Sequence, residues 1–370
     1  MPLRQQIRFC AAPDGVRLAY ALSGAGPPML KVGNWLSHLE YDFTNPVWGH
    51  LLDALSAGHT VVRYDQRGTG LSDRDVSAIS FDAWVNDLET VIDASGVRSP
   101  FPIIGISQGA SIGIAYAVRH PERVSHLVLH GGYARGRRKR GGGAIMEEES
   151  ETFAKMAELG WSRSDSSFRQ FFTNQFLPQA SSDQQRWFNE LSLLSVSAQT
   201  TGRMIREFDR IDVTHLLGRV RCPTLVLHAS RDLRVPFDEG RLIASSIPGA
   251  RFVPLDSAYH LMLADDPAWP HWRDEVRSFL GAEGAALGDA RFAALTPRER
   301  ELLDLIARGR DNTQLCALLQ LSQKTIRNHI TSIFAKLQVE NRAQAIVLAR
   351  EAGFGSNGEA NGTAVPPLHG

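Results

Sequence analysis

The sequence predicts an α/β fold, with a mostly parallel sheet and a helical lid, followed by a small all-α helix-turn-helix domain. Three observations indicate this. The chain has 370 residues, too many for one ordinary domain. Short apolar runs alternate with helical patterns through residue 280, as in a parallel sheet covered on both faces. From about residue 295 to residue 351 only helical periodicity remains.

The expected strands are short runs rich in valine, isoleucine and leucine, with the expected helices between them. The strands are Val16–Leu22, Met29–Val32, Thr60–Tyr64, Phe101–Gly105, Val124–His130, Thr224–His228 and Arg251–Pro254. Helical segments include Phe81–Ala94, Gly109–His120 and Pro267–Leu280. From about residue 134 to 215 the pattern is helical with many aromatic residues, which we interpret as a lid inserted over the sheet. These aromatic side chains either form the lid core or line a pocket.

We therefore expect a first domain over residues 1–280 and a helix-turn-helix domain over residues 295–354. Residues 281–294 are small and rich in glycine, which is typical of a flexible linker. The tail, residues 355–370, contains asparagine, glycine, serine and proline and little that could be buried. We expect this tail to be disordered.

Charge is distributed unevenly along the chain, although the net charge is zero. Residues 291–352 hold ten Lys and Arg against six Asp and Glu, an excess of four positive charges. The rest of the chain holds 30 against 34, an excess of four negative charges. The basic excess thus coincides with the predicted helix-turn-helix, where attraction to phosphate groups would require it.

The composition also bears on compartment and cofactors. No run approaches the ~18 apolar residues that span a bilayer, and residues 1–5 lack an apolar signal segment. The cysteines Cys10, Cys222 and Cys316 are far apart and form no CxxC motif, which favours reduced thiols in the cytoplasm over disulfides or a zinc site. We expect a cytoplasmic protein that uses neither a metal nor a cofactor and does not bind membranes.

Residues 105–109 read Gly-Ile-Ser-Gln-Gly, the Gly-x-Ser-x-Gly pattern of a nucleophile turn. Its glycines allow a sharp turn that raises the serine above the strand end. The context agrees, because a predicted strand precedes Ser107 and a predicted helix follows it. The pentapeptide alone is a moderate signal, since small residues can surround a serine by chance.

Partners for Ser107 follow in the chain order expected of a serine hydrolase. Asp232 comes shortly after one predicted strand and His260 after the next. Histidine removes the serine proton, and the carboxylate orients the histidine and stabilises its charged form. Asp256 is a rival acid, but it lies only four residues before His260.

An oxyanion requires two backbone N–H donors. The residue after the nucleophile, Gln108, supplies one. The second should come from the turn after the strand Met29–Val32, where the Asn34 amide is our candidate.

These residues closely resemble the α/β-hydrolase superfamily over residues 15–280. Further matches are a tight turn, a Pro-Glu-Arg-Val motif and an Asp-Pro-Ala-Trp motif, at Asp65–Ser72, Pro121–Val124 and Asp266–Trp269. The resemblance implies an α/β-hydrolase fold in which the turn at residues 65–72 is structural rather than catalytic.

Two departures from that family are visible. Val32 stands where a histidine is usual, and Tyr259 where a glycine commonly precedes the catalytic histidine. Neither removes a required group. Two interpretations stay open: an intact triad that performs acyl transfer, or a degenerate enzyme fold used for binding. The basic run Arg135–Arg140 is either a solvated loop or an anchor for an anionic ligand.

The C-terminal block begins with a strong helix start. Thr296-Pro297-Arg298-Glu299 is a capping box with proline at the first helical position, and Gly309 ends the helix. A second helix is expected over Asn312–Leu319, and its buried residues should be Leu315, Leu318 and Leu319.

A third helix should run from its cap Ser322 to about Leu337. Its expected inner face is Ile326, Ile330, Ile333 and Phe334. Its outer face holds no acidic residue and carries Lys324, Thr325, Arg327, Asn328, His329 and Thr331. A helix that enters the major groove of DNA needs such a face. The alternative is a helical packing module that binds no nucleic acid.

This block resembles the LuxR-type DNA-binding domain over about 60 residues. The matches are Leu295–Glu299, Asn312, Ser322–Ile326, His329, Lys336–Leu337 and Asn341–Ala345, with Leu315-Cys316 replacing the usual Ile-Ala. The resemblance implies base contacts by Arg327, Asn328 and Thr331, and phosphate contacts by Lys324, Thr325, His329 and Lys336. It also implies a homodimer through a fourth helix, Arg342–Glu351, whose apolar residues are Ala343, Ile346, Val347 and Ala349.

The two resemblances imply a transcriptional regulator that senses a small, largely apolar ligand in a hydrolase-like pocket and binds an operator in double-stranded DNA. The rival hypothesis is an active serine hydrolase of an ester, lactone or amide, in which the small domain serves assembly or localisation. An intermediate hypothesis is a regulator that hydrolyses its own inducer.

Overall fold

The computed structural model describes residues 4–97, 100–163, 167–351 and 354. The chain divides into two compact units, residues 1–277 and 278–370. The predicted tail, residues 355–370, lies outside the described residues. Within the described ranges, no helix combines the length and apolar character needed to cross a membrane.

The first unit is built on an eight-stranded sheet with the order β1-β2-β4-β3-β5-β6-β7-β8. The strands are β1 (Gln5–Ala11), β2 (Arg17–Ser23), β3 (Pro28–Lys31), β4 (Thr60–Tyr64), β5 (Phe101–Ile106), β6 (Val124–His130), β7 (Thr224–Ala229) and β8 (Arg251–Leu255). β2 pairs antiparallel with β1 and β4, and the remaining pairings are parallel. The predicted strands are all present, and the mostly parallel sheet is confirmed.

The edge strand β1 was not predicted. Ile7 and Phe9 alternate with polar residues, which is a two-residue period, but Phe9 stays 55% exposed. An edge strand has one neighbour and buries little, so its sequence signal is weak.

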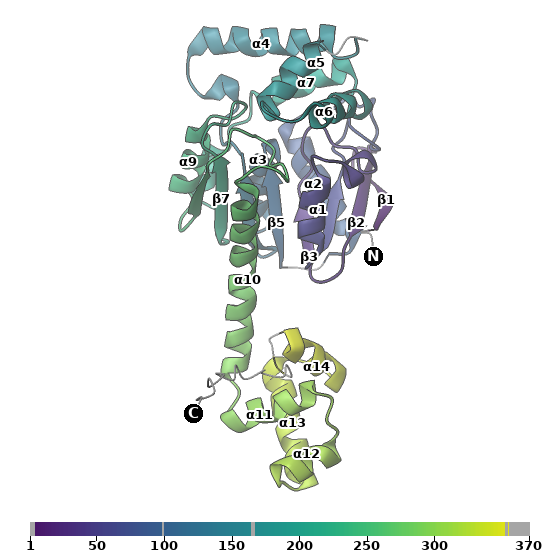
Figure 1. Ribbon diagram of the computed structural model, residues 1–370, viewed down its shortest axis with the longest axis vertical. Coiled ribbons are helices and arrows are strands. Elements are labelled where there is room, and N and C mark those ends of the chain that lie inside the picture. Colours follow the sequence, from purple (N-terminus) through teal and green to yellow (C-terminus); the bar gives the residue numbers. More distant parts are fainter. Residues whose placement is uncertain (1–3, 98–99, 164–166, 352–353, 355–370) are drawn as a thin grey trace, which may run out of the picture. The chain divides into compact units, whose positions relative to one another are not determined.

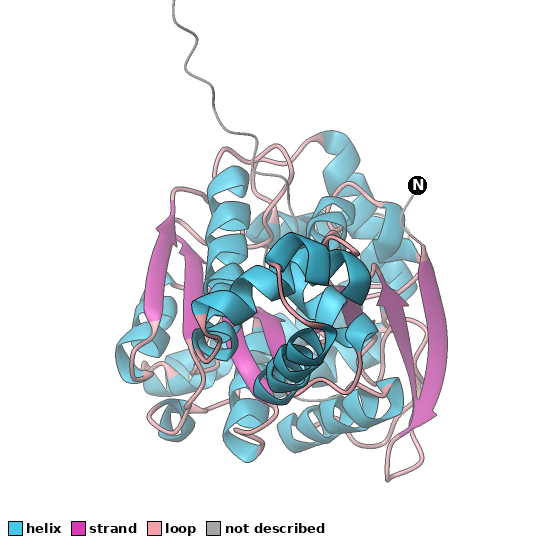
Figure 2. Ribbon diagram, turned by 90° about the horizontal axis from the view of Figure 1, so that it is seen from below, coloured by secondary structure: helices cyan, strands magenta, loops and turns pink. Residues whose placement is uncertain are grey.

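Helices cover both faces of the sheet (Figures 1 and 2). They are α1 (Gly49–Ser56), α2 (Phe81–Ser95), α3 (Gln108–Arg119), α8 (Thr214–Leu217), α9 (Phe237–Ser246) and the start of α10 (Trp269–Ala293). Helix α2 begins at Ser80, whose hydroxyl accepts a hydrogen bond from the Ala83 N–H. Helices α2, α3, α8 and α9 contact one another in turn and form one layer.

The lid is the connection between β6 and β7 (Figure 1). It holds η2 (Arg137–Lys139), α4 (Gly143–Gly160), α5 (Ser167–Phe176), α6 (Ser182–Ser195) and α7 (Ala198–Phe208). The sequence left open whether the aromatic residues form the lid core or line a pocket, and the structure has residues of both kinds. Trp161 and Phe172 are buried in the lid core, Phe176 and Phe208 line a pocket, and Phe171 is 49% exposed.

The turn after β4 has the structural role that the sequence predicted. The Arg67 guanidinium donates to both oxygens of Asp87, at 2.7 and 2.6 Å, and to Asp14 at 2.6 Å. One oxygen of Asp65 accepts from the N–H groups of Leu39 and Leu71. These bonds fix the loops beneath the lid, and the two carboxylates around Arg67 compensate its buried charge.

The segment expected to be a flexible linker is helical, since α10 continues to Ala293. Alanine, the strongest helix former, outnumbers glycine in residues 281–294, and glycine weakens a helix by only about 1 kcal/mol. Glycine content alone therefore gave the wrong secondary structure here. The predicted domain boundaries remain predictions.

The second unit contains the four predicted helices: α11 (Pro297–Ala307), α12 (Asn312–Leu319), α13 (Gln323–Leu337) and α14 (Arg342–Glu351). Thr296 and Glu299 form the expected capping box, and Ser322 caps α13. Leu315 and Leu319 are buried, but Leu318 is 56% exposed, so its predicted burial is wrong. On a helix Leu318 lies between the two buried positions in sequence but points away from them.

Candidate functional site

Ser107 lies at a strained turn between β5 and α3. Its backbone φ is 56° and its ψ is −129°, a combination that costs a non-glycine residue about 1–3 kcal/mol. Gly105 permits this turn because a Cβ there would lie 2.6 Å from the Gly109 carbonyl oxygen. The turn holds the serine above the strand end, as the Gly-x-Ser-x-Gly pattern predicts.

The structure brings His260 and Asp232 together. His260 Nδ1 lies 2.7 Å from Asp232 Oδ2, and both side chains are fully buried. The other oxygen of Asp232 accepts from the N–H groups of Arg234 and Val235, at 2.7 and 2.9 Å. The rival Asp256 pairs instead with Arg231 at the surface.

The pKa of Asp232 lies below its usual value. Burial alone would raise this pKa. The charge of His260 and its hydrogen bond to Asp232 outweigh burial and lower the pKa, together with the charge of His228 and the hydrogen bond from the Val235 N–H. Asp232 is therefore an ionised acceptor for His260 at neutral pH.

His260 is held from several sides. Its N–H donates to the Phe176 carbonyl at 3.0 Å, and the Phe176 ring meets the imidazole edge-on at 5.3 Å. A Cβ on Gly131 would lie 3.2 Å from the imidazole, so a glycine there lets the ring pack closely. Among the described residues His260 Nε2 has no hydrogen-bond partner, Ser107 included. Such contacts commonly tighten only when substrate binds.

Two further histidines, which no sequence motif marks, lie beside this pair. His130 Nε2 lies 3.2 Å from the His260 carbonyl oxygen, and His228 Nε2 lies 3.1 Å from that of Val235 and 3.7 Å from Asp232 Oδ2. Burial lowers the pKa of both, that of His130 to about 3, so both are neutral. His130 is the last residue of β6, and His228 is the residue before the last one of β7. Both therefore lie at the carboxyl edge of the sheet, where ligand-binding and active sites form in α/β folds.

A chain of side-chain amides links Gln108 to the turn that contains Asn34. Gln108 Nε2 donates to Gln66 Oε1 at 3.2 Å, and Gln66 Nε2 donates to the Gly33 carbonyl at 3.0 Å. The Asn34 side chain accepts from Lys31 at 2.6 Å. Of the described residues around the pocket, this turn contributes Trp35 to the lining rather than Asn34. The Asn34 amide remains a prediction.

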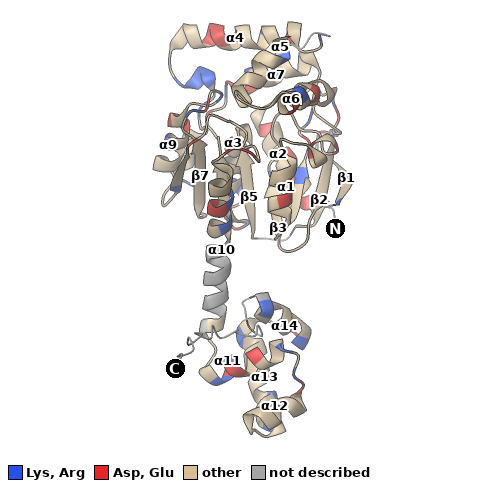
Figure 3. Cartoon of the chain, in the orientation of Figure 1, with Lys and Arg blue, Asp and Glu red and all other residues tan. Residues whose placement is uncertain are grey.

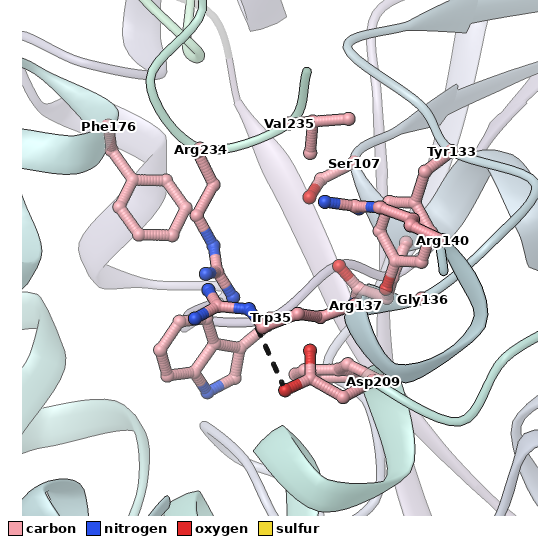
Figure 4. Close-up of a pocket in the computed structure, with 12 residues that line it drawn as sticks. Trp35, Ser107, Tyr133, Gly136, Arg137, Arg140, Phe176, Asp209, Arg234 and Val235 are labelled. Carbon is pink, nitrogen blue, oxygen red and sulfur yellow. Dashed lines mark ion pairs between the residues drawn. The ribbon is translucent and has the colours of Figure 1, made fainter. Parts of the chain in front are cut away.

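The pocket beside Ser107 is small and cationic (Figure 4). Its free volume is about 20 Å³, room for one or two water molecules. The lining residues are Trp35, Ser107, Gln108, Tyr133, Gly136, Arg137, Arg140, Phe176, Phe208, Asp209, Arg234 and Val235. Three arginines face one carboxylate among the aromatic side chains of this lining. The small, largely apolar ligand expected from the sequence remains a prediction.

The basic run at the start of the lid is structured, so the solvated-loop interpretation is wrong. Arg135 donates to Glu239 at 2.8 and 3.1 Å, and Arg138 pairs with Glu147 at 2.6 Å. Arg137 and Arg140 line the pocket. The sequence could not show which arginines of this run form ion pairs and which line the pocket, because their side chains are alike.

In the second unit, the predicted DNA-contacting residues lie along α13. Lys324, Arg327, Asn328 and Thr331 are exposed, whereas Thr325 and His329 are half-buried. Helix α13 carries no Asp or Glu (Figure 3), while α11 carries three. The Ile326 and Ile333 side chains are fully buried on the opposite face.

Lys336 makes an internal ion pair. Its ammonium donates to Glu299 at 2.7 Å, and Glu299 also accepts from Ser332 at 2.7 Å and from the Thr296 N–H at 2.8 Å. Burial alone would raise the pKa of Glu299, but these bonds lower it to about 2. A phosphate contact by Lys336 would compete with this pair.

The predicted apolar face of α14 is divided. Ala349 is fully buried and Ile346 packs against the core of the unit, so neither is free to form a surface face. Ala343 is exposed and Val347 is 57% exposed. With Leu337, Val339 and Leu348 they border an apolar hollow of about 470 Å³.

The comparisons with known proteins match the two units separately. Residues 38–267 match the alpha/beta hydrolase fold family, and residues 293–349 match the luxR family of bacterial regulatory proteins. A putative carbamate hydrolase of Azorhizobium caulinodans is 28% identical over 252 residues, which cover 68% of this chain and 90% of that protein. The transcriptional regulatory protein DesR of Bacillus subtilis is 40% identical over 60 residues, covering 16% of this chain and 30% of that protein.

A solved structure supports the same fold. A hydrolase from Pseudomonas aeruginosa superposes with a TM-score of 0.61 at 26% identity, covering 75% of this chain and 98% of that one. The Burkholderia xenovorans enol-lactonase superposes with a TM-score of 0.59 at 20% identity, covering 74% of this chain and 100% of that one, which shows the fold alone.

Proposed function

We propose that this chain, which belongs to the alpha/beta hydrolase fold family and ends in a LuxR-type regulatory domain, is a transcriptional regulator whose hydrolase-like pocket senses a small ligand. The LuxR-type domain supports regulation through DNA binding. Ligand sensing by the first unit is our inference. Because its target is the chromosome, we propose a cytoplasmic location.

The exposed, acid-free face of α13 carries the DNA-binding proposal. Arg327, Asn328 and Thr331 are our candidates for base contacts, since arginine donates two bonds to guanine and asparagine two to adenine. Lys324, Thr325 and His329 are our candidates for phosphate contacts. Lys336 is proposed for a phosphate contact as well, although its pair with Glu299 also stabilises the unit.

We further propose that two copies pair on the operator through α14. Ala343 and Val347 are exposed apolar residues beside a hollow, and pairing would cover them. A two-fold pair of α13 helices would contact half-sites about one helical turn apart.

For the first unit we propose Ser107 as nucleophile, His260 as general base and Asp232 as its orienting acid, with the Asn34 and Gln108 amides as oxyanion donors. The 2.7 Å contact between His260 and Asp232 and the strained Ser107 favour retained acyl-transfer chemistry. An active hydrolase of an ester, lactone or amide is therefore the second candidate function, and it is compatible with regulation if turnover ends the signal.

The DNA-binding proposal is tested by selecting from a random duplex library with the full-length protein. The expected product is a two-fold-symmetric sequence with half-sites about one helical turn apart. A chain that enriches no sequence, or one half-site only, would contradict the operator or the dimer respectively.

A further inference from the structure

Three arginine side chains point into the pocket beside Ser107 from two segments of the chain (Figure 4). Arg137 and Arg140 come from the start of the lid, and Arg234 comes from the loop after β7, two residues beyond Asp232. Residues of like charge from separate segments repel one another when they converge. A fold that brings them together needs a compensating anion.

Among the described residues, Arg234 forms no ion pair, and Asp209 acts on it only at longer range. Its guanidinium lies over the rings of Phe153, Phe172 and Phe176, at 5.6, 6.0 and 5.5 Å, and its side chain donates no hydrogen bond to any described residue. The faces of these rings attract the cation but accept none of its N–H donors. Burial, and after it the charge of Arg137, lowers the pKa of Arg234 to about 10, which still leaves it charged.

The carboxylates nearby do not compensate the three cations. Asp209 lies 4.0 Å from Arg137 Nε, too far for a hydrogen bond, and this is its only ion pair in the described chain. Glu239 lies 4.0 Å from Arg140 but already accepts two bonds from Arg135. The pocket is left with an excess of guanidinium donors over acceptors.

Arg137 also borders a second hollow. An outer groove of about 530 Å³ between α4 and α5 is lined by Arg137, Phe153, Phe171 and neighbouring residues of the lid. The inner pocket, at about 20 Å³, admits nothing larger than water unless a side chain moves. Arg137 lines both spaces.

We propose that the ligand of this pocket carries a carboxylate, bound by Arg234 and Arg137, at one end and the group that meets Ser107 at the other. A guanidinium presents two parallel N–H donors that match the two oxygens of a carboxylate. The phenyl rings around Arg234 contact the short apolar stem of such a ligand. The inference rests on the proposed function, since it takes the pocket beside Ser107 to be the ligand site.

The test compares two probes that share a methyl ester and differ at the other end, where one has a carboxylate and the other a methyl group. Monomethyl glutarate carries a carboxylate, and methyl pentanoate is its neutral counterpart of similar length. Binding to the full-length Ser107→Ala protein is measured by calorimetry, so that hydrolysis cannot remove the probe. We expect the anionic probe to bind, and the neutral probe to bind about 10- to 100-fold more weakly, as for loss of bonds to a charged group.

Arg234→Met replaces the cation with an apolar chain of similar length. It should remove the preference for the anion while leaving the neutral probe unaffected. Arg231→Met is the matched control, because Arg231 is three residues away, exposed, and paired with Asp256 at the surface. That control should bind both probes as the parent does.

A thermal melt separates binding from a structural role. An uncompensated, half-buried cation destabilises the free protein, so Arg234→Met should melt at a higher temperature than the parent without ligand. A lower melting temperature, equal binding of the two probes, or no binding by any monoester from malonate to adipate would overturn the proposal. Failure of operator selection or of Ser107 labelling would instead count against the proposed function.

Discussion

The candidate sites of the two units are built in opposite ways. In the first unit Ser107, Asp232 and His260 come from distant parts of the chain, and the Asp232 and His260 side chains are fully buried. In the second unit the candidate residues lie along one helix, α13, and most are exposed. A buried site depends on the whole fold and tolerates little change, whereas a surface helix depends on its own cap and inner face. The two sites should therefore respond differently to single substitutions.

The largest effect is expected at Ser107. Ser107→Ala should abolish the covalent adduct with a serine-reactive phosphonate and reduce any ester hydrolysis by roughly 10³-fold or more, because it removes the proposed nucleophile. Mass spectrometry of the labelled protein measures this. Ser111→Ala, a control on the same helix whose hydroxyl bonds to the Tyr133 carbonyl, should keep the adduct. An adduct that persists in Ser107→Ala would remove Ser107 from its role.

A smaller but structural effect is expected at Glu299. Glu299→Gln loses the charge that holds Lys336, Ser332 and Thr296, at a cost of about 1–3 kcal/mol in the stability of the second unit. Amide hydrogen exchange in α11 of the full-length protein reports this. Glu301→Gln changes an exposed residue of the same helix that pairs with Arg298, and should have little effect.

The same network predicts a dependence on pH. The folded pKa of Glu299 is about 2, below its usual 4.5. The stabilisation is thus complete above about pH 4.5 and is lost as the pH falls toward 2. Exchange in α11 that is unchanged between pH 5 and pH 3, after correction for intrinsic rates, would show that the network contributes nothing.

On the exposed, acid-free face of α13, Arg327→Ala should weaken binding to the selected operator by about 1–3 kcal/mol. It should also relax the preference for one base pair. Lys324→Ala should weaken binding to every sequence and reduce the slope of the salt dependence by about one unit. Binding isotherms on the operator and on single-base variants, at several salt concentrations, distinguish the two. Identical base preferences for wild type and Arg327→Ala would contradict the base contact.

The smallest effect is expected on α14. Val347→Ala removes two exposed carbon atoms that pairing would cover, worth about 1 kcal/mol of dimerisation on DNA. Sedimentation of the protein–DNA complex measures this loss of dimerisation. Leu318→Ala removes an equally exposed apolar residue of α12 and should leave pairing unchanged.

The same contrast explains what the sequence could predict. The capping box at Thr296–Glu299, the apolar periodicity and the helix bounds of the second unit are local features, and the sequence predicted them closely. The second capping box, formed by Asp311 and Gln314, was not predicted. Leu318 was wrongly predicted to be buried, because the side of the helix on which a leucine lies decides whether it is buried. In the first unit the parallel strands and the order of Ser107, Asp232 and His260 were predicted, since motif and chain order carry them.

The lining of the pocket could not be predicted in the same way. Arg234 has no motif, and its position beside Arg137 results from packing between the lid and the loop after β7. His130 and His228 are ordinary strand residues until the sheet places them around Asp232. Local sequence shows which residues can perform chemistry, but contacts between distant segments decide which of them share a site.

If the first unit is the sensor, occupancy of its pocket should control DNA binding. The experiment measures affinity for the selected operator before and after a phosphonate modifies Ser107 in the full-length protein. We predict a change in operator affinity for the wild type upon modification, and no change for Ser107→Ala treated in the same way. Equal affinities for modified and unmodified wild type, with complete labelling shown by mass, would contradict the claim.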